Sequence, residues 1–281
     1  MILVDYNQVM IGTLMVNAKT QADVSEQLLR HMVLNTLRSY RKQFGKTYGE
    51  VVICNDSRHY WRKDVFPLYK ANRKGAREAS PFDWKEIFQI FDKLKAELKE
   101  NFPYKFIDVM GAEADDVIGV ICKYHHAKEN TLILSSDKDF IQLHKYKGVR
   151  QYSPAQHKFV KHQNPIAYLK EHTIRGDRGD GIPNFLSADD CIVEGVRQQS
   201  ISKKKLDVWL TQSMDEICTS LDMTEKWNRN DQLVNLDKIP KALVEDIMNE
   251  FEKEPLGKRK DLYNYMVMNK LSNLVNVITD F

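Results

Sequence analysis

Residues 131–139 read TLILSSDKD, a short apolar run followed directly by two carboxylates, Asp137 and Asp139. A run of this length that is rich in apolar and β-branched residues is typical of a buried strand. Three other segments repeat the pattern: residues 2–4 precede Asp5, residues 51–54 precede Asp56, and residues 104–110 precede Glu113 and Asp115. We therefore expect four buried strands, each with acidic residues at its carboxyl end.

Stretches with helical periodicity separate these strands, because apolar residues recur at helical spacing in residues 22–44, 84–98 and 114–124. Alternation of strand and helix predicts an α/β fold with a mostly parallel central sheet flanked by helices, completed by a strand near residues 148–152. After residue 165 the sequence is charged, helical in pattern and poor in strand signals. We place an α/β domain at residues 1–165 and a smaller all-helical domain at residues 166–281.

Composition narrows the class of protein. The chain has 281 residues, of which 42% are hydrophobic, and it balances 42 Lys+Arg against 39 Asp+Glu, which fits a folded chain with a sizeable core. No apolar run approaches the ~18 residues of a membrane-spanning helix, and the first residues do not resemble a signal peptide. The four cysteines lack the C-x-x-C spacing of zinc or redox sites. We expect a cytoplasmic monomer with no membrane partner.

The placement of the acids predicts a metal site, since the carboxyl ends of parallel strands meet at one edge of the sheet. Two unit charges ~4 Å apart repel by ~4 kcal/mol at an effective dielectric of ~20, so a cation is needed among them. Oxygen ligands without Cys or His favour Mg²⁺ or Mn²⁺, and two carboxylates two residues apart can face neighbouring ions, as in a two-metal site. The acids concerned are Asp5, Asp56, Glu113, Asp115, Asp137 and Asp139.

Each of these acids taken alone is also explained as a helix cap, because carboxylates are favoured at helix N-termini. Asp116 fits that structural role best, since it points about a hundred degrees away from Asp115 on a helix. We leave Asp116 outside the site.

Basic and aromatic residues alternate after Asp56. From residue 58 to residue 77 there is a single acid, Asp64, and aromatic side chains stand at positions 60, 61, 66 and 69. Cations beside stacking rings suit a single-stranded nucleic acid or a frayed duplex end, whereas the alternative is a solvated surface with aromatics in the core. The basic residues are Arg58, Arg62, Lys63, Lys70, Arg73, Lys74 and Arg77.

A second segment, GDRGDGIPN at residues 176–184, predicts a tight hairpin. Its backbone amides suit a duplex phosphate and its carbonyls suit a monovalent cation, while an ordinary Asx-rich loop fits the same residues. We expect Arg178, Gly179 and Gly181 to contact nucleic acid.

Taken together, these motifs resemble the flap endonuclease and 5′-3′ exonuclease family and are most similar to its T-even bacteriophage ribonuclease H branch. The matching pieces stand in family order: VD at residues 4–5, CNDS at 54–57, YKANR at 69–73, EADD at 113–116, SSDKDFIQL at 135–143 and GDRGD at 176–180. The resemblance implies a Mg²⁺-dependent nuclease with a PIN-like (5′-nuclease-like) fold. Such an enzyme hydrolyses phosphodiester bonds near the 5′ end of RNA or DNA strands annealed to DNA, and so removes primers and flaps in replication.

The same resemblance implies a role for each matching residue. One Mg²⁺ or Mn²⁺ ion would be held by Asp5, Asp56, Glu113, Asp115 and Asp137, and a second by Asp139, Asp177 and Asp180. Lys70 and Arg73 would act with Asp115 in catalysis, from a basic arch at about residues 58–85. Residues 176–184 would form a helix-hairpin-helix-type element that grips duplex DNA, with K⁺ as a ligand. The implied substrates are branched or nicked DNA and RNA–DNA hybrids, and the implied protein partners are a single-strand-binding protein or a sliding clamp.

Two other functions fit parts of the pattern. A phosphohydrolase with an aspartyl nucleophile would use Asp5, but this chemistry requires a second carboxylate two residues later, and that position is Asn7. A non-catalytic nucleic-acid-binding module with a decayed metal site is expected to have lost several of the acids, and all of them are present.

Overall fold

A six-stranded sheet forms the centre of the computed structural model, which describes residues 1–20 and 24–281. The strand order is β3-β2-β1-β4-β5-β6; β1 to β5 are parallel, and β6 is antiparallel to β5. The strands are β1 (Ile2–Asp5), β2 (Val51–Cys54), β3 (Lys105–Ile107), β4 (Thr131–Leu134), β5 (Val149–Ser153) and β6 (Lys158–Val160). The predicted mostly parallel α/β sheet is confirmed, and β6 is a further strand that the sequence pattern did not predict.

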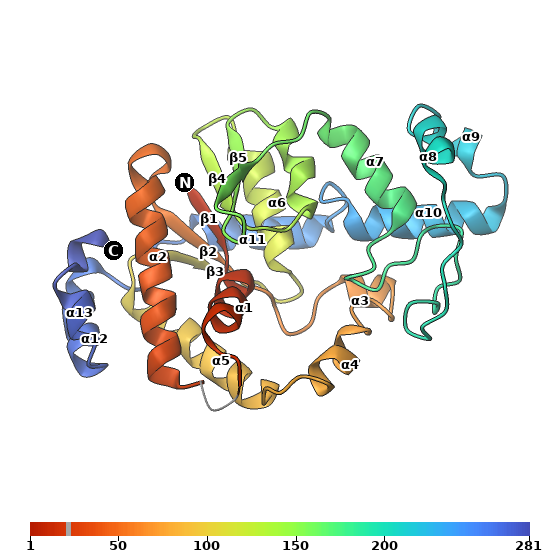
Figure 1. The fold of residues 1–281 in the computed structure, drawn as a ribbon. Helices are drawn as coiled ribbons and strands as arrows, with labels where there is room; N and C mark the ends of the chain where they lie inside the picture. Colours follow the sequence, from red (N-terminus) through yellow and green to blue (C-terminus); the bar gives the residue numbers. More distant parts are fainter. Residues whose placement is uncertain (21–23) are drawn as a thin grey trace.

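Helices connect the strands and form most of the chain after them (Figure 1). The predicted helix at residues 22–44 begins at a position that lies outside the described residues, and α2 is described from Glu26. The α-helices are α1 (Tyr6–Asn17), α2 (Glu26–Tyr48), α3 (Arg62–Val65), α4 (Arg73–Glu78), α5 (Trp84–Asn101), α6 (Ala114–His125), α7 (Pro165–Arg175), α8 (Lys203–Trp209), α9 (Met214–Ile217), α10 (Leu221–Val234), α11 (Lys241–Glu252), α12 (Leu262–Met268) and α13 (Ser272–Val275). Short 3-10 helices are η2 (Asp139–Lys145), η3 (Arg259–Asp261) and η4 (Ile278–Asp280).

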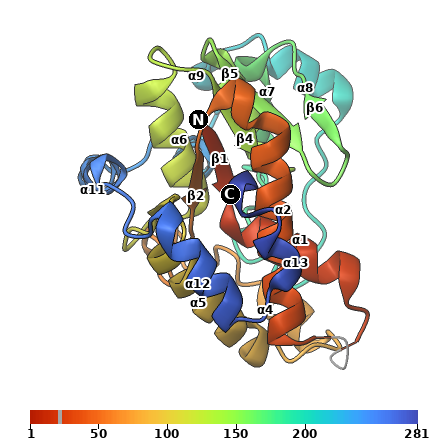
Figure 2. The same cartoon turned by 90° about the vertical axis from the view of Figure 1, so that its left-hand side faces the viewer.

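Helices cover both faces of the sheet. Alternate residues of each strand point to opposite faces, so each strand contributes side chains to two cores. Ile2 and Val4 belong to an apolar core with residues of α1, α2 and α5, whereas Leu3 and Val52 belong to a second core with residues of α6 and α11. Figure 2 shows α6 and α11 on one side of the sheet and α2 on the other. Burial on both faces explains why β1, β2 and β4 are continuous apolar runs rather than alternating ones.

The strand order reverses at β1, which pairs with β2 on one edge and with β4 on the other. The chain first builds outward through β2 and β3 and then returns through α6 to β4. Ligands in open α/β sheets bind beside such a reversal, at the carboxyl ends of the strands. Asp5 pairs in register with Cys54, so the last residues of β1 and β2 stand level at that place.

Helices α7 to α10 pack around a separate apolar core that includes Ile174, Phe185, Trp209 and Trp227. The chain then returns to the sheet: α11 packs in the core with α6, and α12 and α13 pack in the core with α2. The domain boundary at residue 165 stays a prediction. The last helices, α11 to α13, pack against the helices that cover the sheet and not in the separate core of α7 to α10. No helix within residues 1–20 and 24–281 is long and apolar enough to cross a membrane.

Two connections reach the edge of the sheet where the acids lie. The link from β2 to α5, the predicted arch, contains α3 and the exposed helix α4 (Figure 1). The predicted hairpin begins after α7 at Gly176, which has a φ of 64° and leaves no room for a Cβ against the Ile182 and Pro183 carbonyls. Residues 184–202, which follow, form turns and irregular structure. The helix-hairpin-helix-type element therefore consists here of one helix and a turn without a second helix directly after it.

Candidate metal centre

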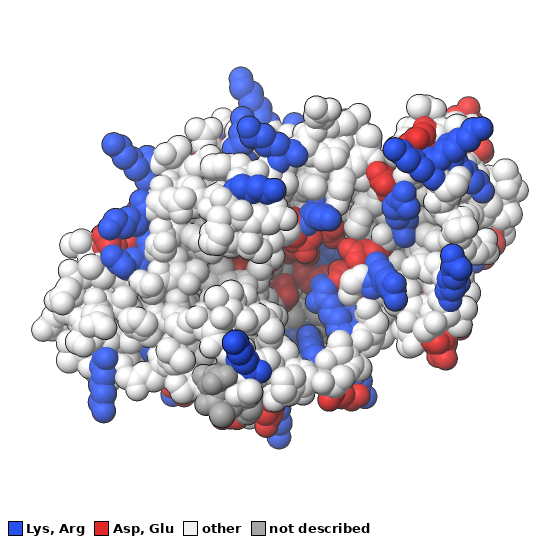
Figure 3. Space-filling model, in the orientation of Figure 1, with Lys and Arg blue, Asp and Glu red and all other residues white. Residues whose placement is uncertain are grey.

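Four elements bring their acids to one edge of the sheet. Asp5 ends β1 and caps α1, since its Oδ1 accepts a hydrogen bond from a backbone amide of α1 at 3.0 Å. Asp56 follows β2 and accepts a hydrogen bond from the Ala114 amide at 2.6 Å, which ties the end of β2 to the first turn of α6. Asp115 lies in that turn, and Asp137 lies in the loop after β4. Figure 3 shows acidic side chains gathered in a hollow, with Lys and Arg around it.

The first group of carboxylates carries more negative charge than its surroundings balance. Burial, together with the charge of Asp56, raises the pKa of Asp5 to about 7. Burial and the charge of Asp137 raise the pKa of Asp115 well above its usual range, and burial and the charge of Asp139 raise the pKa of Asp137 to about 6. In the part of the chain that the structure describes, no group forms a hydrogen bond or an ion pair with the Asp115 carboxylate. A bound divalent cation relieves this kind of repulsion.

Glu113, by contrast, is balanced by protein cations. Its side chain is buried; Arg62 Nη1 lies 2.8 Å from Oε2, and Lys70 Nζ lies 2.5 Å from Oε1. The Tyr69 hydroxyl lies 3.2 Å from Oε2. The ammonium of Lys70 therefore stands where it can offset negative charge at the metal centre.

The structure places Arg62 inside the protein, contrary to the expectation that it contacts nucleic acid. The Arg62 side chain is only 3% exposed, lies 2.8 Å from Asp116 and donates to the Leu233 carbonyl at 2.7 Å. Asp116 is also buried, and it accepts hydrogen bonds from Trp61 Nε1 at 3.1 Å and from the Glu113 amide at 2.9 Å. Arg62 and Asp116 thus join α3, α6 and α10, which is the structural role expected for Asp116.

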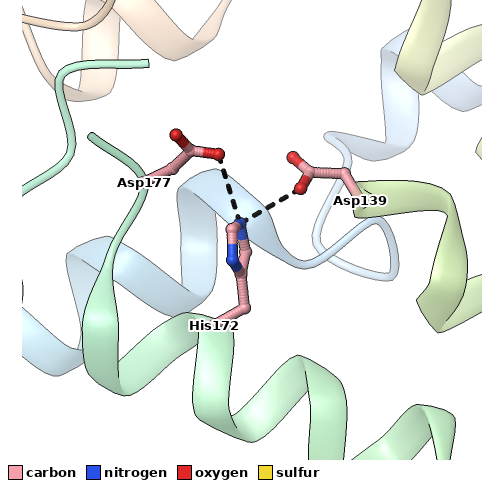
Figure 4. Close-up of side chains that lie close together, drawn as sticks. All are labelled: Asp139, His172 and Asp177. Atoms are coloured by element: carbon pink, nitrogen blue, oxygen red, sulfur yellow. Dashed lines mark ion pairs between the residues drawn. The ribbon is translucent and has the colours of Figure 1, made fainter. Parts of the chain in front are cut away.

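A second group of ligand atoms consists of Asp139, His172 and Asp177 (Figure 4), near enough to Asp137 for the charges of Asp139 and Asp177 to raise its pKa. One oxygen each of Asp139 and Asp177 and one ring nitrogen of His172 all lie within 4.8 Å of one another. The three side chains line an open depression of about 500 Å³. Burial lowers the pKa of His172, but Asp139 and then Asp177 outweigh it and raise this pKa to about 9.

Asp180, the third residue predicted for the second metal, faces the arch. Its carboxylate accepts a hydrogen bond from the Tyr69 hydroxyl at 2.8 Å, lies 3.6 Å from Lys70 Nζ and forms an ion pair with Arg73. Burial raises the pKa of Asp180, but Lys70 and Arg73 outweigh burial and hold this pKa below its usual value. Lys70 consequently bridges Glu113 of the first group and Asp180 of the second.

The hairpin uses its own backbone amides. The Gly179 and Asp180 amides donate to Asp177 Oδ1 at 2.6 and 3.1 Å, and the Gly181 amide donates to the Arg178 carbonyl at 3.3 Å. Gly181 is buried, with a φ of 73°. Neither glycine amide is free for a phosphate, so these amides form an Asx-type turn in place of the predicted phosphate contact. Arg178, which is exposed, is the available contact at this loop.

The remaining basic residues of the arch lie on the surface. Lys63, Lys74 and Arg77 are exposed, and Arg73 is 44% exposed on its side chain. The Arg58 side chain is 90% exposed and pairs with Asp92 on α5 at 2.7 Å. Lys63 lies over the ring of Tyr60, and Arg77 lies over the ring of Phe88 on α5. Trp61, Phe66 and Tyr69 are buried, so most aromatic side chains of this run pack in the core, as in the alternative interpretation, while these cations lie on the surface.

Sequence reasoning missed Asn7, Tyr69 and His172 as parts of the site. Asn7 donates to Asp56 Oδ2 at 2.6 Å, and its place in the first turn after Asp5 is a signal that could have found it. Tyr69 has no such signal, because Glu113 is 44 residues away in the sequence. His172 pairs with Asp139 on another element and with Asp177 in the turn that follows its own helix, and only the second partner is near in the sequence.

Comparison with known proteins agrees with this geometry. A family model described as "5'-3' exonuclease, N-terminal resolvase-like domain" matches residues 2–172, and a second, "T4 RNase H, C terminal", matches residues 166–281. The ribonuclease H of Enterobacteria phage T4 is 32% identical, with 99% of this chain and 95% of that protein covered. A 5'-3' exonuclease of Buchnera aphidicola is 29% identical over 40% of this chain and 37% of its own length.

Solved structures share the fold at low sequence identity. A bacteriophage T5 D15 flap endonuclease variant, in a complex with DNA and metal ions, has a TM-score of 0.66 at 17% identity and covers 90% of this chain and 99% of its own. The T5 5'-exonuclease with bound zinc has a TM-score of 0.65 at 16% identity, covering 90% of this chain and 98% of its own. With a family model over most of the chain and a near full-length relative, the chain belongs to the 5′-3′ exonuclease family.

Proposed function

We propose that the chain is a structure-specific 5′-3′ nuclease that hydrolyses phosphodiester bonds near the 5′ end of RNA or DNA strands annealed to DNA. Such an activity removes RNA primers and flaps during replication. The observation that carries the proposal is that Asp5 at the end of β1 and Asp115 in α6 both lie near enough to Asp137, after β4, for its charge to raise their pKa values, beside the cations Lys70 and Arg73.

The donor atoms support Mg²⁺ or Mn²⁺ at the first site, because they are all carboxylate oxygens. Asp5, Asp56, Glu113, Asp115 and Asp137 are the residues that would hold it. In a two-metal mechanism, an ion bound there would supply a water of lowered pKa, and a second ion would supply positive charge for the leaving 3′ oxygen. A second ion would be held near Asp139 and Asp177, with Asp180 at the boundary of the two groups.

Lys70 and Arg73 supply fixed positive charge at the same place. Their side chains extend from the arch to the carboxylates and pair with Glu113 and Asp180. A phosphate that enters between the acids and the arch meets both cations, so these residues neutralise the charge that develops on it. Asp115 contributes a carboxylate that has no hydrogen-bond or ion-pair partner among residues 1–20 and 24–281, which leaves its oxygens available to the metal.

Substrate choice follows from the surroundings of the site. The exposed cations Lys63, Lys74 and Arg77 line the arch and suit the phosphates of a single-stranded 5′ end. Lys203, Lys204 and Lys205 at the start of α8 add exposed positive charge that suits a duplex backbone.

We propose branched or nicked DNA and RNA–DNA hybrids as substrates for a monomer in the cytoplasm. A single-strand-binding protein or a sliding clamp is the proposed partner, and K⁺ the proposed ligand of the hairpin at residues 176–184.

Cleavage of a 5′-labelled flap and of an RNA–DNA hybrid, with Mg²⁺ and with EDTA, tests the function. We expect short labelled products only with Mg²⁺. We expect Asp115→Asn to slow cleavage by at least about a hundredfold, as for loss of a group that stabilises transition-state charge, with little change in DNA binding by fluorescence anisotropy. Asp64→Asn, on the exposed part of the arch, is the matched control and should cleave normally.

Other outcomes favour the competing functions. Hydrolysis of small phosphomonoesters without cleavage of the flap would support the phosphohydrolase. The structure does not favour that function, because Asp5 Oδ1 caps α1 and Asn7 donates a hydrogen bond to Asp56. Binding of the flap without cleavage in Mg²⁺ would support the non-catalytic module. Undiminished turnover by Asp115→Asn would remove Asp115 from the site.

A further inference from the structure

His172 lies inside the second group of acids and is unused by the proposed chemistry. It stands in the last turn of α7, with 13% of its side chain exposed. Nε2 lies 3.2 Å from an oxygen of Asp139 and 3.7 Å from an oxygen of Asp177. Figure 4 shows the three side chains pointing toward one another from η2, from α7 and from the loop after α7.

The spacing of these atoms is close to that of the ligands of one metal ion and slightly wider, so small movements would close it around an ion. Nitrogen and oxygen ligands about 2.1 Å from a common ion lie about 3 to 3.5 Å apart. Without metal, the two carboxylates hold the His172 ring as an imidazolium, since Nε2 forms ion pairs with both and the His172 pKa is raised to about 9. A metal ion bound at this place would displace the Nε2 proton to solvent and take over both carboxylates. The nitrogen is aimed at the space that the two oxygens share.

The surrounding contacts hold the three side chains in place. The His172 ring stacks on Tyr168, with 6.1 Å between the ring centroids and an angle of 11° between the planes. One oxygen of Asp177 is fixed by the Gly179 and Asp180 amides, which leaves the other oxygen facing His172. A preformed set of ligands loses little entropy when it binds an ion.

We propose that Asp139, His172 and Asp177 form a mixed nitrogen–oxygen site that selects a first-row transition metal ion, such as Mn²⁺, over Mg²⁺. Imidazole nitrogen is a favourable ligand for transition metals, whereas Mg²⁺ prefers oxygen. The first group of acids offers oxygen alone, so the two sites differ in their metal preference. This inference rests on the proposed function only in that the ion bound here is the second ion of the same centre.

Pulsed electron paramagnetic resonance of Mn²⁺ bound to the metal-stripped full chain tests the site directly. We expect a nitrogen hyperfine coupling to Mn²⁺ that changes when the protein carries histidine labelled with the heavy nitrogen isotope. A wild-type spectrum without nitrogen coupling would overturn the proposal, and this measurement does not depend on any variant folding.

The variant His172→Gln keeps an amide that can bond to Asp139 but removes the imidazole nitrogen. We expect it to lose the nitrogen coupling and at least about tenfold in Mn²⁺ affinity. Mutating even a residue that only hydrogen-bonds to a metal ligand lowers metal affinity by about 10–100-fold. Its Mg²⁺ affinity should change much less. His157→Asn is the matched control, because His157 is exposed on the β5–β6 turn with a φ of 50°, a conformation that Asn tolerates. Coupling that persists in His172→Gln would refute the assignment.

The assay of the proposed function is separate from this test. Wild-type cleavage of a flap in Mg²⁺ together with a spectrum lacking nitrogen coupling overturns the mixed site alone. Absence of cleavage by the wild-type chain overturns the nuclease function, while a histidine coupling would still establish the metal site.

Discussion

Replacing Asp5 by asparagine should stabilise the metal-free protein near neutral pH. The pKa of Asp5 rises from 3.8 to about 7 in the folded chain, through burial and then the charge of Asp56. Each tenfold change in proton affinity is worth about 1.36 kcal/mol, so the ionised Asp5 costs the fold at most about 4 kcal/mol. The asparagine would keep an oxygen for the α1 amide that now donates to Asp5 Oδ1, so the helix cap is preserved.

The effect of the substitution depends on pH in a defined direction. Because the folded pKa is raised, protonated Asp5 favours the fold, and this contribution is fully present below the unfolded pKa of about 4. It is lost as the pH rises through about 7, the folded value. Asp5→Asn should therefore match the wild type at pH ~4 and exceed it by about 2–4 kcal/mol at pH ~7.5 without metal.

Urea denaturation in EDTA at both pH values measures the difference, with the m-value as a check that the unfolding transition is unchanged. Added Mg²⁺ should raise the free energy of unfolding of the wild type more than that of the variant, because the ion needs the Asp5 carboxylate. Equal free energies of unfolding for the two proteins at pH ~7.5 in EDTA would refute the reasoning, since Asp5 would then carry no buried charge.

Other substitutions separate catalysis from folding. Lys70→Ala combined with Arg73→Ala should lower the cleavage rate in Mg²⁺ more than it weakens duplex affinity, because both cations lie at the carboxylates; an unchanged rate would remove them from the reaction. Arg62→Met should destabilise the fold by about 3–5 kcal/mol in thermal or urea unfolding, since it leaves Glu113 and Asp116 with less compensating charge in the interior. Arg58→Met, at an ion pair on the surface, is its control and should change stability by less than about 1 kcal/mol.

The sheet could be read from the sequence because apolar runs and acids recur together. The run before Asp5 and the run before Asp137 are buried on both faces, so each is a continuous apolar segment that stands out from its surroundings. Strand β6 does not stand out, because Lys158–Val160 is a short and largely exposed edge strand. Helix α1 follows β1 with no loop between them, since Asp5 is at once the last strand residue and the helix cap.

The composition of the arch could not show which of its cations is buried. Arg62 and Lys63 are neighbours in the same basic run, yet Arg62 is enclosed by Glu113 and Asp116 while Lys63 is exposed. The difference is set by contacts with residues about fifty positions later, which no local pattern records. Paired carboxylates attract a buried guanidinium because each would otherwise lack a compensating charge.

The second group of acids shows the same limit. The strand before Asp139 predicts the place of that residue, but His172 is a single histidine on a helix whose partners come from other elements. Local sequence also left the hairpin with open alternatives, and the bonds that Asp177 makes with the amides after it argue against one of them, a phosphate held by these amides. Side-chain positions that depend on tertiary contacts need the folded chain.

Crystals of the metal-stripped protein soaked in Mn²⁺ give the most direct test of the central claim. Anomalous diffraction from Mn²⁺ would locate each ion and the oxygens around it. The account predicts one ion among the carboxylates at the ends of β1, β2 and β4 and the start of α6, with Asp115 as a ligand. Absence of manganese at that place, while Asp5, Asp115 and Asp137 lie as in the structure described here, would contradict it.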